Sequence, residues 1–206
     1  DTVAISADGE YIVSGSYDGK KIYLFERDSS TPLWNYSTGG GVRTVAISAD
    51  GEYIVAASLG STSVRKIYLF DKDSSTPIWS YTTSGHVNSI AISLDSEYIA
   101  AASGDGKVYL FDRDSSTPLW TYSAATNAYS VAISADGKYI TASGYKKVYL
   151  FDKDSSTPLW THTITETQNL ESVAISVDGE YIAAGSNDHK VYLFGKDSST
   201  PLWSYG

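Results

Sequence analysis

The hydrophobic and polar positions of this chain follow a pattern that recurs five times. Each copy contains four short apolar runs, and the segments between them are rich in Asp-Gly, other glycines or Ser-Thr-Pro. Short apolar runs bounded by such turn residues predict β-strands, and no stretch has its apolar positions at the spacing of a helix. The sequence therefore predicts an all-β protein.

One copy, around residues 88–123, shows the four expected strands. They are Ile90–Ser93, Tyr98–Ser103, Lys107–Phe111 and Leu119–Tyr122. In four of the five copies an Asp-Gly pair follows the first strand, which is a strong hairpin signal because glycine tolerates positive φ. Asp-Ser-Ser-Thr-Pro precedes the fourth strand, where proline fixes φ at the end of the turn. The second and third strands are apolar on both faces, as expected for a sheet covered on both sides.

The segment Asp-Ser-Ser-Thr-Pro-Leu-Trp, with one Leu-to-Ile change, sets the period of the repeat. Its five copies contain every tryptophan and every proline, and successive tryptophans lie 40 to 45 residues apart. This period is typical of a propeller blade, which buries its apolar faces only against neighbouring blades. We expect a single domain of residues 1–206, a five-bladed β-propeller with four antiparallel strands per blade. The blades are expected at about 1–37, 43–82, 88–123, 129–163 and 171–206.

Three recurring runs, Val-Ala-Ile-Ser-x-Asp-Gly, Tyr-Ile-Ala-Ala-x-Ser and Lys-Val-Tyr-Leu-Phe-Asp, together resemble a WD-repeat blade, over essentially the whole chain, although Glu26 and Gly195 replace the last Asp in the first and fifth copies. Phe-Asp replaces the Trp-Asp that names the family, at Phe70-Asp71, Phe111-Asp112 and Phe151-Asp152. The buried Asp-His-Ser-Trp network that the resemblance implies is therefore mostly absent. Only the third blade nearly has it, with His86, Ser103 and Asp105, which favours a structural role for His86.

The tail of each repeat is similar to the tryptophan-docking motif of quinoprotein-type and outer-membrane-assembly propellers. This resemblance implies that all five tryptophans join one blade to the next. It also implies that the first strand of each blade lines the central channel and the Trp-bearing strand lies outermost. Closure then needs blade one to pack on blade five, or the five repeats are part of a larger array. A start inside a repeat, at Asp1, and the absence of methionine favour a processed segment.

Charge and composition limit the classes of partner that this chain is expected to bind. The chain has 24 acidic and 15 basic residues and no cysteine, for a net charge of -9. Nucleic-acid binders usually show a basic surface, and no apolar run approaches the ~18 residues of a membrane helix. We expect neither nucleic-acid binding nor membrane insertion. The sequence does not indicate a cellular compartment. A monomer is expected, with a blade-sharing oligomer as the alternative because near-identical blades can pack on one another.

Differences among the five copies gather at one end of the expected propeller, which we call the top. Loops at the other end are nearly invariant, whereas top loops such as 59–64 and 163–170 differ in every copy. The residue two positions before each Val-Ala-Ile-Ser differs most, and pseudo-symmetry places these five residues around the mouth of the channel. This top-face ring consists of Asp1, Arg43, Asn88, Tyr129 and Glu171. Supporting top-loop residues are Tyr17, His86, Tyr145 and His189.

The top-face ring predicts binding, because rigid scaffolds commonly carry recognition residues on loops. Free drift of loop positions after duplication is the alternative. The leading hypothesis is a non-catalytic binding or scaffold propeller that engages a peptide or protein with its top face. Alternatives are glycan or small-ligand binding at the channel mouth, and a repeat array amplified recently or by design with no dedicated ligand.

Motifs of catalysis are not found. The sequence has no Gly-rich phosphate loop, zinc-ligand pair or nucleophile elbow. The Asp-x-Asp-Ser-Ser run lacks the glycine and distal glutamate of a calcium loop, so we expect it to cap a turn. No catalytic residue, metal or cofactor is predicted, and a quinoprotein-like or hydrolytic enzyme is the less favoured alternative.

Overall fold

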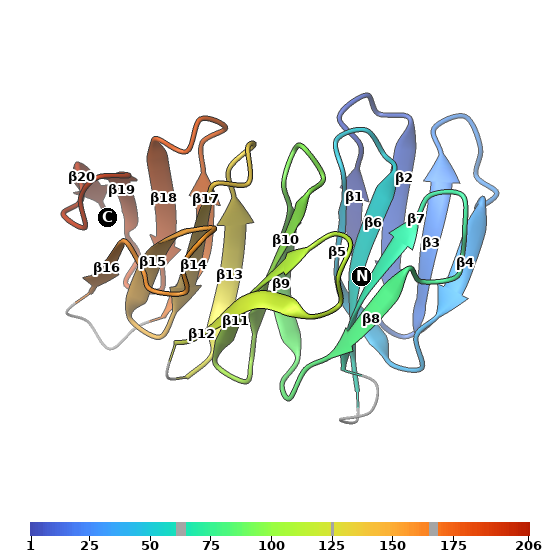
Figure 1. The fold of residues 1–206 in the computed structure, drawn as a ribbon, viewed down its shortest axis with the longest axis horizontal. Coiled ribbons are helices and arrows are strands. Elements are labelled where there is room, and N and C mark those ends of the chain that lie inside the picture. The colour runs from blue at the N-terminus through green and yellow to red at the C-terminus, as the bar shows by residue number, and fades with distance from the viewer. Residues whose placement is uncertain (61–64, 125, 165–168) are drawn as a thin grey trace.

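The chain folds into five antiparallel sheets of four strands each (Figure 1). The computed structural model describes residues 1–60, 65–124, 126–164 and 169–206, and this part contains no helix. Within each sheet the strands follow one another in chain order, so every connection is a hairpin. The protein is a five-bladed β-propeller, as the sequence predicts.

Each blade begins with the strand nearest the axis and ends with the Trp-bearing strand. Blade 1 contains β1 (Thr2–Ile5), β2 (Tyr11–Ser16), β3 (Lys21–Glu26) and β4 (Trp34–Ser37). Blade 2 contains β5 (Gly41–Ile47), β6 (Tyr53–Leu59), β7 (Lys66–Asp71) and β8 (Trp79–Thr82). Blade 3 contains β9 (Val87–Ile92), β10 (Tyr98–Ser103), β11 (Lys107–Asp112) and β12 (Pro118–Ser123). Blade 4 contains β13 (Ala128–Ile133), β14 (Tyr139–Gly144), β15 (Lys147–Asp152) and β16 (Trp160–Thr163). Blade 5 contains β17 (Leu170–Ile175), β18 (Tyr181–Ser186), β19 (Val191–Gly195) and β20 (Trp203–Tyr205).

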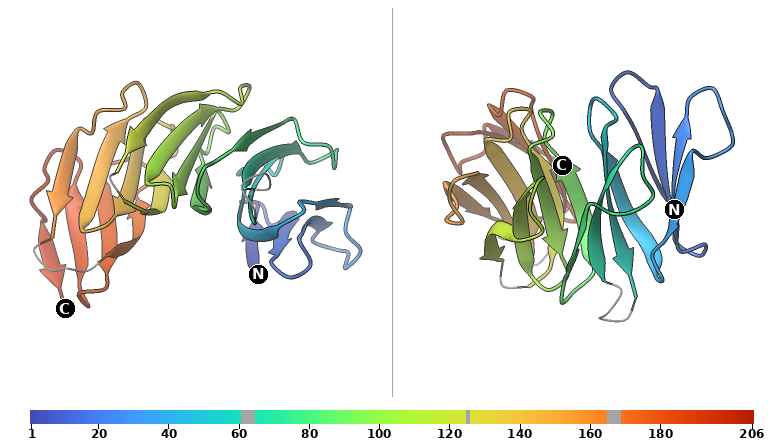
Figure 2. Two further views of the ribbon diagram at one scale, coloured as in Figure 1. Left: turned by 90° about the horizontal axis from the view of Figure 1, so that it is seen from below. Right: turned by 45° about the vertical axis from the view of Figure 1, so that its right-hand side comes forward.

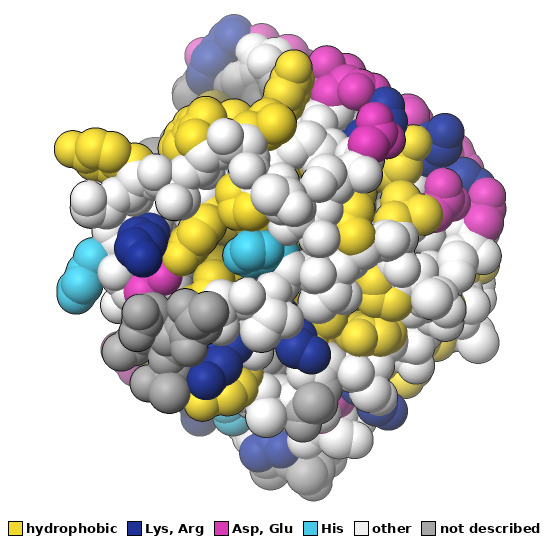
Figure 3. Space-filling view, turned by 90° about the vertical axis from the view of Figure 1, so that its left-hand side faces the viewer, with side chains coloured by type: hydrophobic (Ala, Val, Ile, Leu, Met, Phe, Trp, Pro, Cys, Tyr) yellow, Lys and Arg dark blue, Asp and Glu magenta, His cyan; other side chains and the backbone are white. Residues whose placement is uncertain are grey.

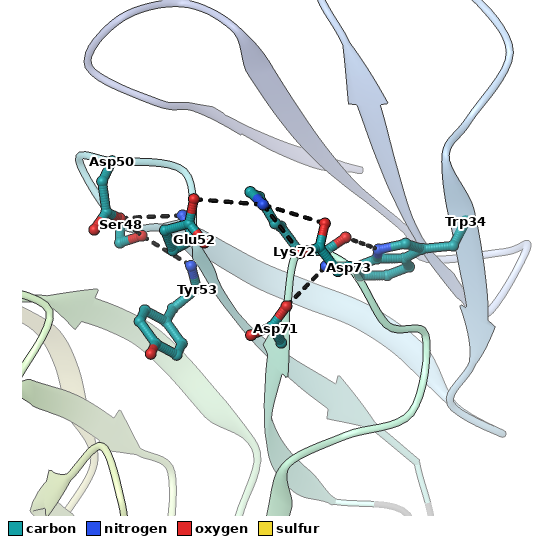
Figure 4. A network of polar contacts seen from close by, with 8 residues as sticks. All are labelled: Trp34, Ser48, Asp50, Glu52, Tyr53, Asp71, Lys72 and Asp73. Atoms are coloured by element: carbon teal, nitrogen blue, oxygen red, sulfur yellow. Dashed lines mark hydrogen bonds and ion pairs between the residues drawn. The ribbon is translucent and has the colours of Figure 1, made fainter.

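A Ser-x-Asp turn closes the first hairpin of each blade. In blade 4 the Ser134 hydroxyl donates to Asp136 at 2.7 Å, and the same carboxylate accepts the backbone N–H of Lys138 at 3.0 Å. Ser134 Oγ also accepts the Tyr139 N–H. The serine hydroxyl and the backbone N–H groups hold the pKa of Asp136 below its ordinary value. Figure 4 shows the corresponding turn of blade 2 around Asp50.

The hydrophobic core is divided among the interfaces between blades. Val13, Ile22 and Leu24 of blade 1 form one buried cluster with Val45 and Phe70 of blade 2. Similar clusters join blades 2 and 3, blades 3 and 4, and blades 4 and 5. Stability in such an arrangement comes largely from contacts between nearest neighbours.

A tryptophan from each of the first four blades crosses to the next blade. The Trp34 indole Nε1 donates to the backbone carbonyl of Lys72 at 2.7 Å (Figure 4). The Trp34 ring also lies 5.3 Å from the ring of Phe70. Trp79, Trp120 and Trp160 donate in the same way, to the carbonyls of Arg113, Lys153 and Lys196. The docking role implied by the sequence resemblance is confirmed for these four tryptophans.

The fifth tryptophan does not follow this pattern. Trp203 is 51% exposed, and its indole makes no such hydrogen bond within the described residues. Successive blades pack through their first strands, β1 on β5, β5 on β9, β9 on β13 and β13 on β17. Figure 2 shows that the result is an arc whose two end blades stand apart. The implied docking of all five tryptophans is therefore wrong for Trp203, because no blade lies against it.

Ser96 is a strained exception to the hairpin turns, and its replacement should stabilise the protein. It stands where the other copies have glycine, with φ of +62°, and its buried hydroxyl has no hydrogen-bond partner in the described part of the chain. Because glycine adopts the left-handed conformation without the steric cost that serine pays, and because Ser96→Gly also removes an unpaired buried hydroxyl, we expect the free energy of unfolding to rise by about 1 kcal/mol. Urea titration followed by circular dichroism measures this, with Gly179→Ser in blade 5 as the reciprocal variant expected to lose stability. An unchanged or lower midpoint for Ser96→Gly would contradict the assignment.

Candidate functional site

Four of the five first strands carry a β-bulge at the same place. In β5, Val42 pairs with Ser58 and Thr44 pairs with Ala57, so that Arg43 between them has no partner on β6. The register skips one residue of β9, β13 and β17 in the same way. The skipped residues are Asn88, Tyr129 and Glu171, which the sequence had singled out as members of the top-face ring. Bulges change the direction of a side chain and are frequent next to functional sites.

The bulges follow from the spacing of apolar residues. Val42 and Val45 lie three positions apart, yet both are buried in the cluster shared with blade 1. In a regular strand, residues three apart face opposite sides of the sheet. One extra residue must therefore be accommodated before both valines can face blade 1, and Arg43 is that residue. The pairs Val87 and Ile90, Ala128 and Val131, and Leu170 and Val173 repeat this spacing.

The bulged residues meet in one polar cavity at the top of the arc. This cavity, which we call the top hollow, has a volume of about 290 Å³. Its lining consists of Arg43, His86, Asn88, Gly104, Asn127, Tyr129 and Glu171. The structure thus brings together four members of the top-face ring and one supporting residue, His86. They supply a cation, an anion, amides, a phenol and an imidazole.

Some of these side chains are engaged within the protein and others are not. Asn88 Nδ2 donates to the Ala128 carbonyl at 2.8 Å, which joins blade 3 to blade 4. Glu171 Oε1 accepts from Asn187 Nδ2 at 3.0 Å. Within the described residues the side chains of Arg43 and Tyr129 have no hydrogen-bond partner. The guanidinium and the phenol are therefore available to a ligand.

The remaining sequence-derived candidates lie elsewhere. Asp1 precedes β1, where no bulge forms, and its carboxylate accepts the Tyr17 N–H at 3.0 Å outside the top hollow. Tyr17 itself lines a second hollow of about 400 Å³ between the top loops of blades 1 and 2. Tyr145 pairs through its backbone with Asn169, and His189 is exposed in a turn with φ of +68°. Parts of the variable loops 59–64, 123–128 and 163–170 lie outside the described residues.

His86 does not take part in the buried network that the WD-repeat resemblance implies. Its side chain is exposed in the top hollow. Asp105 instead accepts the Tyr109 hydroxyl at 2.7 Å and the Ser84 N–H at 3.2 Å, and Ser103 Oγ accepts the Asp105 N–H. Burial, together with the Asp105 carboxylate, raises the pKa of Tyr109. The prediction of a structural His86 in a buried network is therefore wrong, since its exposed side chain lines the top hollow.

The bottom face of the propeller, opposite the top hollow, has a second central hollow, and this one is lined mainly by apolar side chains. Its volume is about 310 Å³, and it is lined mainly by the isoleucine that follows each Val-Ala or Ile-Ala pair, together with neighbouring small apolar residues. Every blade contributes equivalent residues, so this hollow carries no chemistry that differs from blade to blade. The Asp-x-Asp-Ser-Ser segments nearby cap turns, as expected. Asp71 accepts the Asp73 N–H at 2.8 Å and Ser74 Oγ accepts the Thr76 N–H at 3.1 Å.

The described residues contain no group of three or more His, Cys, Asp or Glu side chains placed to hold a metal ion. No helix with the length and apolar character of a transmembrane span occurs among them.

Comparison with known proteins covers nearly the whole chain. Residues 2–205 match the family described as outer membrane protein assembly factor BamB. No curated protein matches the chain. The family match agrees with the tryptophan-docking resemblance drawn from the repeat tails, while the resemblance to WD-repeat blades stays an interpretation of the sequence. The chain belongs to the BamB family of outer membrane protein assembly factors.

Proposed function

We propose that this propeller is a non-catalytic scaffold that binds a segment of another protein, or a peptide, in the top hollow. The observation that carries the proposal is the set of four bulges, which direct four chemically different residues from a repeated framework into one cavity. Membership in a family described as assembly factors supports a protein partner.

The lining of the top hollow suits an extended or looped polypeptide. Arg43 can form paired hydrogen bonds with a carboxylate or with backbone carbonyls. Tyr129 offers a flat apolar ring and a hydroxyl, and tyrosine and arginine are the residues most often found at the energetic centre of protein interfaces. Glu171 comes from blade 5 and Arg43 from blade 2, so a ligand that contacts both must lie across the hollow. A volume of about 290 Å³ admits a few side chains of a loop tip.

A glycan or small polar ligand is the second candidate. The specific observation in its favour is the Tyr129 ring beside the amides of Asn88 and Asn127, since sugars stack on aromatic rings and hydrogen-bond to amides. Binding on a glycan array, with no peptide selected from a displayed library, would favour this candidate over a protein partner.

Removing single side chains from the top hollow should weaken binding strongly while leaving the fold intact. Peptides selected from a random displayed library against the wild-type chain serve as ligands. We expect the affinity for these peptides to fall by about tenfold or more in each of three variants, Arg43→Ala, Tyr129→Ala and Glu171→Ala. Because Arg43 and Glu171 are exposed and Tyr129 is only partly buried, the melting temperature should stay nearly unchanged. Fluorescence anisotropy measures binding and differential scanning calorimetry measures stability.

The matched control for these variants is Asp114→Ala, which removes an exposed charge from a bottom-face loop of blade 3. It should bind the selected peptides as the wild type does. Peptides that bind Arg43→Ala, Tyr129→Ala and Glu171→Ala with wild-type affinity would show that the top hollow is not the binding site.

A further inference from the structure

Every interface between neighbouring blades joins two unlike faces. We call them the trailing face, which in blade 1 presents Ile22, Leu24, Trp34 and Tyr36, and the leading face, which in blade 2 presents Val45, Tyr68 and Phe70. Across this interface the Tyr36 ring lies edge-on to the rings of Tyr68 and Phe70, at 5.4 and 5.1 Å. The same arrangement recurs between blades 2 and 3 and between blades 3 and 4. Between blades 4 and 5, His162 takes the place of the tyrosine.

The trailing face of blade 5 is uncovered. Val191 is 46% exposed, whereas the residues at its position in the other blades, Ile22, Ile67, Val108 and Val148, are fully buried. Trp203 is 51% exposed and Tyr205 is 79% exposed. Figure 3 views the molecule from the side on which blade 5 lies, and hydrophobic side chains reach the surface there in several places. Blade 5 thus carries a complete trailing face on which none of the described residues packs.

The leading face of blade 1 is uncovered as well. Val3 is 69% exposed, while Val45, Ile90, Val131 and Val173 at the same position are 5% to 8% exposed. Tyr23 and Phe25 stack with their centroids 6.1 Å apart, close to the 6.0 Å between Tyr68 and Phe70 of blade 2. Arg27 stands at the position of Lys72, whose carbonyl accepts the Trp34 indole. The receiving half of the interface is therefore already in place on blade 1.

A third contact points to the same pairing. A tyrosine at the start of the second strand packs on the turn glycine of the next blade. A Cβ added to Gly51 would lie 2.5 Å from Tyr11, one added to Gly137 would lie 2.3 Å from Tyr98, and one added to Gly179 would lie 2.6 Å from Tyr139. The two end blades do not make this contact with each other. Tyr181 of blade 5 is 51% exposed. The atom nearest to a Cβ on Gly9 of blade 1 belongs to Ile5 of the same blade, 4.0 Å away.

We propose that the trailing face of blade 5 docks onto the leading face of blade 1 of a second copy of this chain. The contact repeats the four internal interfaces: Trp203 Nε1 donates to the Arg27 carbonyl of the second copy, Tyr205 packs on Tyr23 and Phe25, and Tyr181 covers Gly9. Closure within one chain would require the end blades to approach across the open side of the arc (Figure 2), which would change the angle at four interfaces whose core side chains are already buried. Such a head-to-tail contact joins unlike surfaces, so one copy can bind a neighbour at each end.

The test uses two charged variants that each block one half of the contact. Trp203→Glu blocks the blade 5 face and Val3→Glu blocks the blade 1 face, and both residues are exposed in the single chain, so folding should be retained. Leu159→Glu, at a 53% exposed residue of blade 4 outside both end faces, is the matched control. Sedimentation velocity at chain concentrations from about 1 to 100 µM detects self-association with a dissociation constant in the micromolar range, which is typical of weak interfaces. Circular dichroism checks that each variant is folded.

We expect the wild type and Leu159→Glu to associate as concentration rises. Trp203→Glu and Val3→Glu alone should each stay monomeric, with self-association weakened about 100-fold or more. A mixture of the two variants should form a one-to-one pair and nothing larger, because each supplies the half that the other lacks. A wild type that stays monomeric throughout, variants that associate like the wild type, or a mixture that does not pair would each overturn the proposal. If the wild type stays monomeric at every concentration, the remaining explanations are ring closure within one chain or a different molecule bound to the end faces.

Discussion

Replacing Trp120 by alanine is expected to lower the free energy of unfolding by about 3 kcal/mol. The indole crosses from blade 3 to blade 4, donates to the Lys153 carbonyl at 2.7 Å and packs 5.3 Å from the Phe151 ring. The variant loses this apolar contact, opens a cavity at the interface and leaves the carbonyl without its donor. Urea unfolding followed by far-ultraviolet circular dichroism, which does not depend on tryptophan emission, measures the change.

Two neighbouring substitutions provide the controls. Leu119→Ala, beside Trp120 and 51% exposed, should change the free energy of unfolding by no more than about 0.5 kcal/mol. Trp203→Ala, the same chemical change on blade 5, should also fall within about 0.5 kcal/mol when measured on dilute, unassociated chain. A loss at Trp203 as large as that at Trp120 would mean that Trp203 is docked in the single chain, and the open arc would be wrong.

Gly137→Ala is expected to cost about 2 to 3 kcal/mol of stability. Gly137 has φ of +67°, a conformation that costs an alanine about 1 kcal/mol or more. The added Cβ would also lie 2.3 Å from Tyr98 Cδ2 on the preceding blade, so the tyrosine must move and its packing is disturbed. Urea denaturation compares this variant with the wild type.

Gly9→Ala separates the two contributions. Gly9 has a similar φ of +73°, but the nearest atom to its Cβ position is 4.0 Å away. Only the cost of the left-handed backbone, about 1 kcal/mol, should remain. The difference between the two variants then measures the contact between blades 3 and 4. Equal losses at Gly9 and Gly137 would show that Tyr98 does not constrain the turn.

The strands and the repeat could be predicted because their signals are local. The expected strand Lys107–Phe111 corresponds to β11 (Lys107–Asp112), and the expected strand Tyr98–Ser103 is β10 without change. Asp-Gly and Ser-Thr-Pro specify turns through the φ preferences of single residues, and these preferences act in any context. The gathering of variable residues at one end followed from the alternation of hairpins along the chain.

The open arc could not be predicted from the pattern. The apolar pattern specifies which faces are buried, but the angle between neighbouring blades depends on how individual side chains such as Trp34 and Phe70 fit together. The sequence left two possibilities, a ring closed by blade 1 on blade 5 or part of a larger array, and the structure is an open arc.

The candidate site was partly predictable. Chemical differences among the copies pointed to Arg43, Asn88, Tyr129 and Glu171, which meet in the top hollow. The bulges that place them there were missed, although the three-residue spacing of Val42 and Val45 contains the signal. Asp1 was grouped with them by pseudo-symmetry but does not line the top hollow, and its carboxylate accepts the Tyr17 N–H instead.

Hydrogen exchange of the five indole N–H groups tests the central claim, that each blade holds the next by one tryptophan and that the arc is open. The Val3→Glu chain with ¹⁵N-labelled tryptophan, in which copies are kept apart, is transferred to D₂O and followed by NMR. We predict four slowly exchanging indole signals, from Trp34, Trp79, Trp120 and Trp160, and one fast signal from Trp203. Five slow signals would show a closed ring, and more than one fast signal would show that the tryptophans do not hold the blades together.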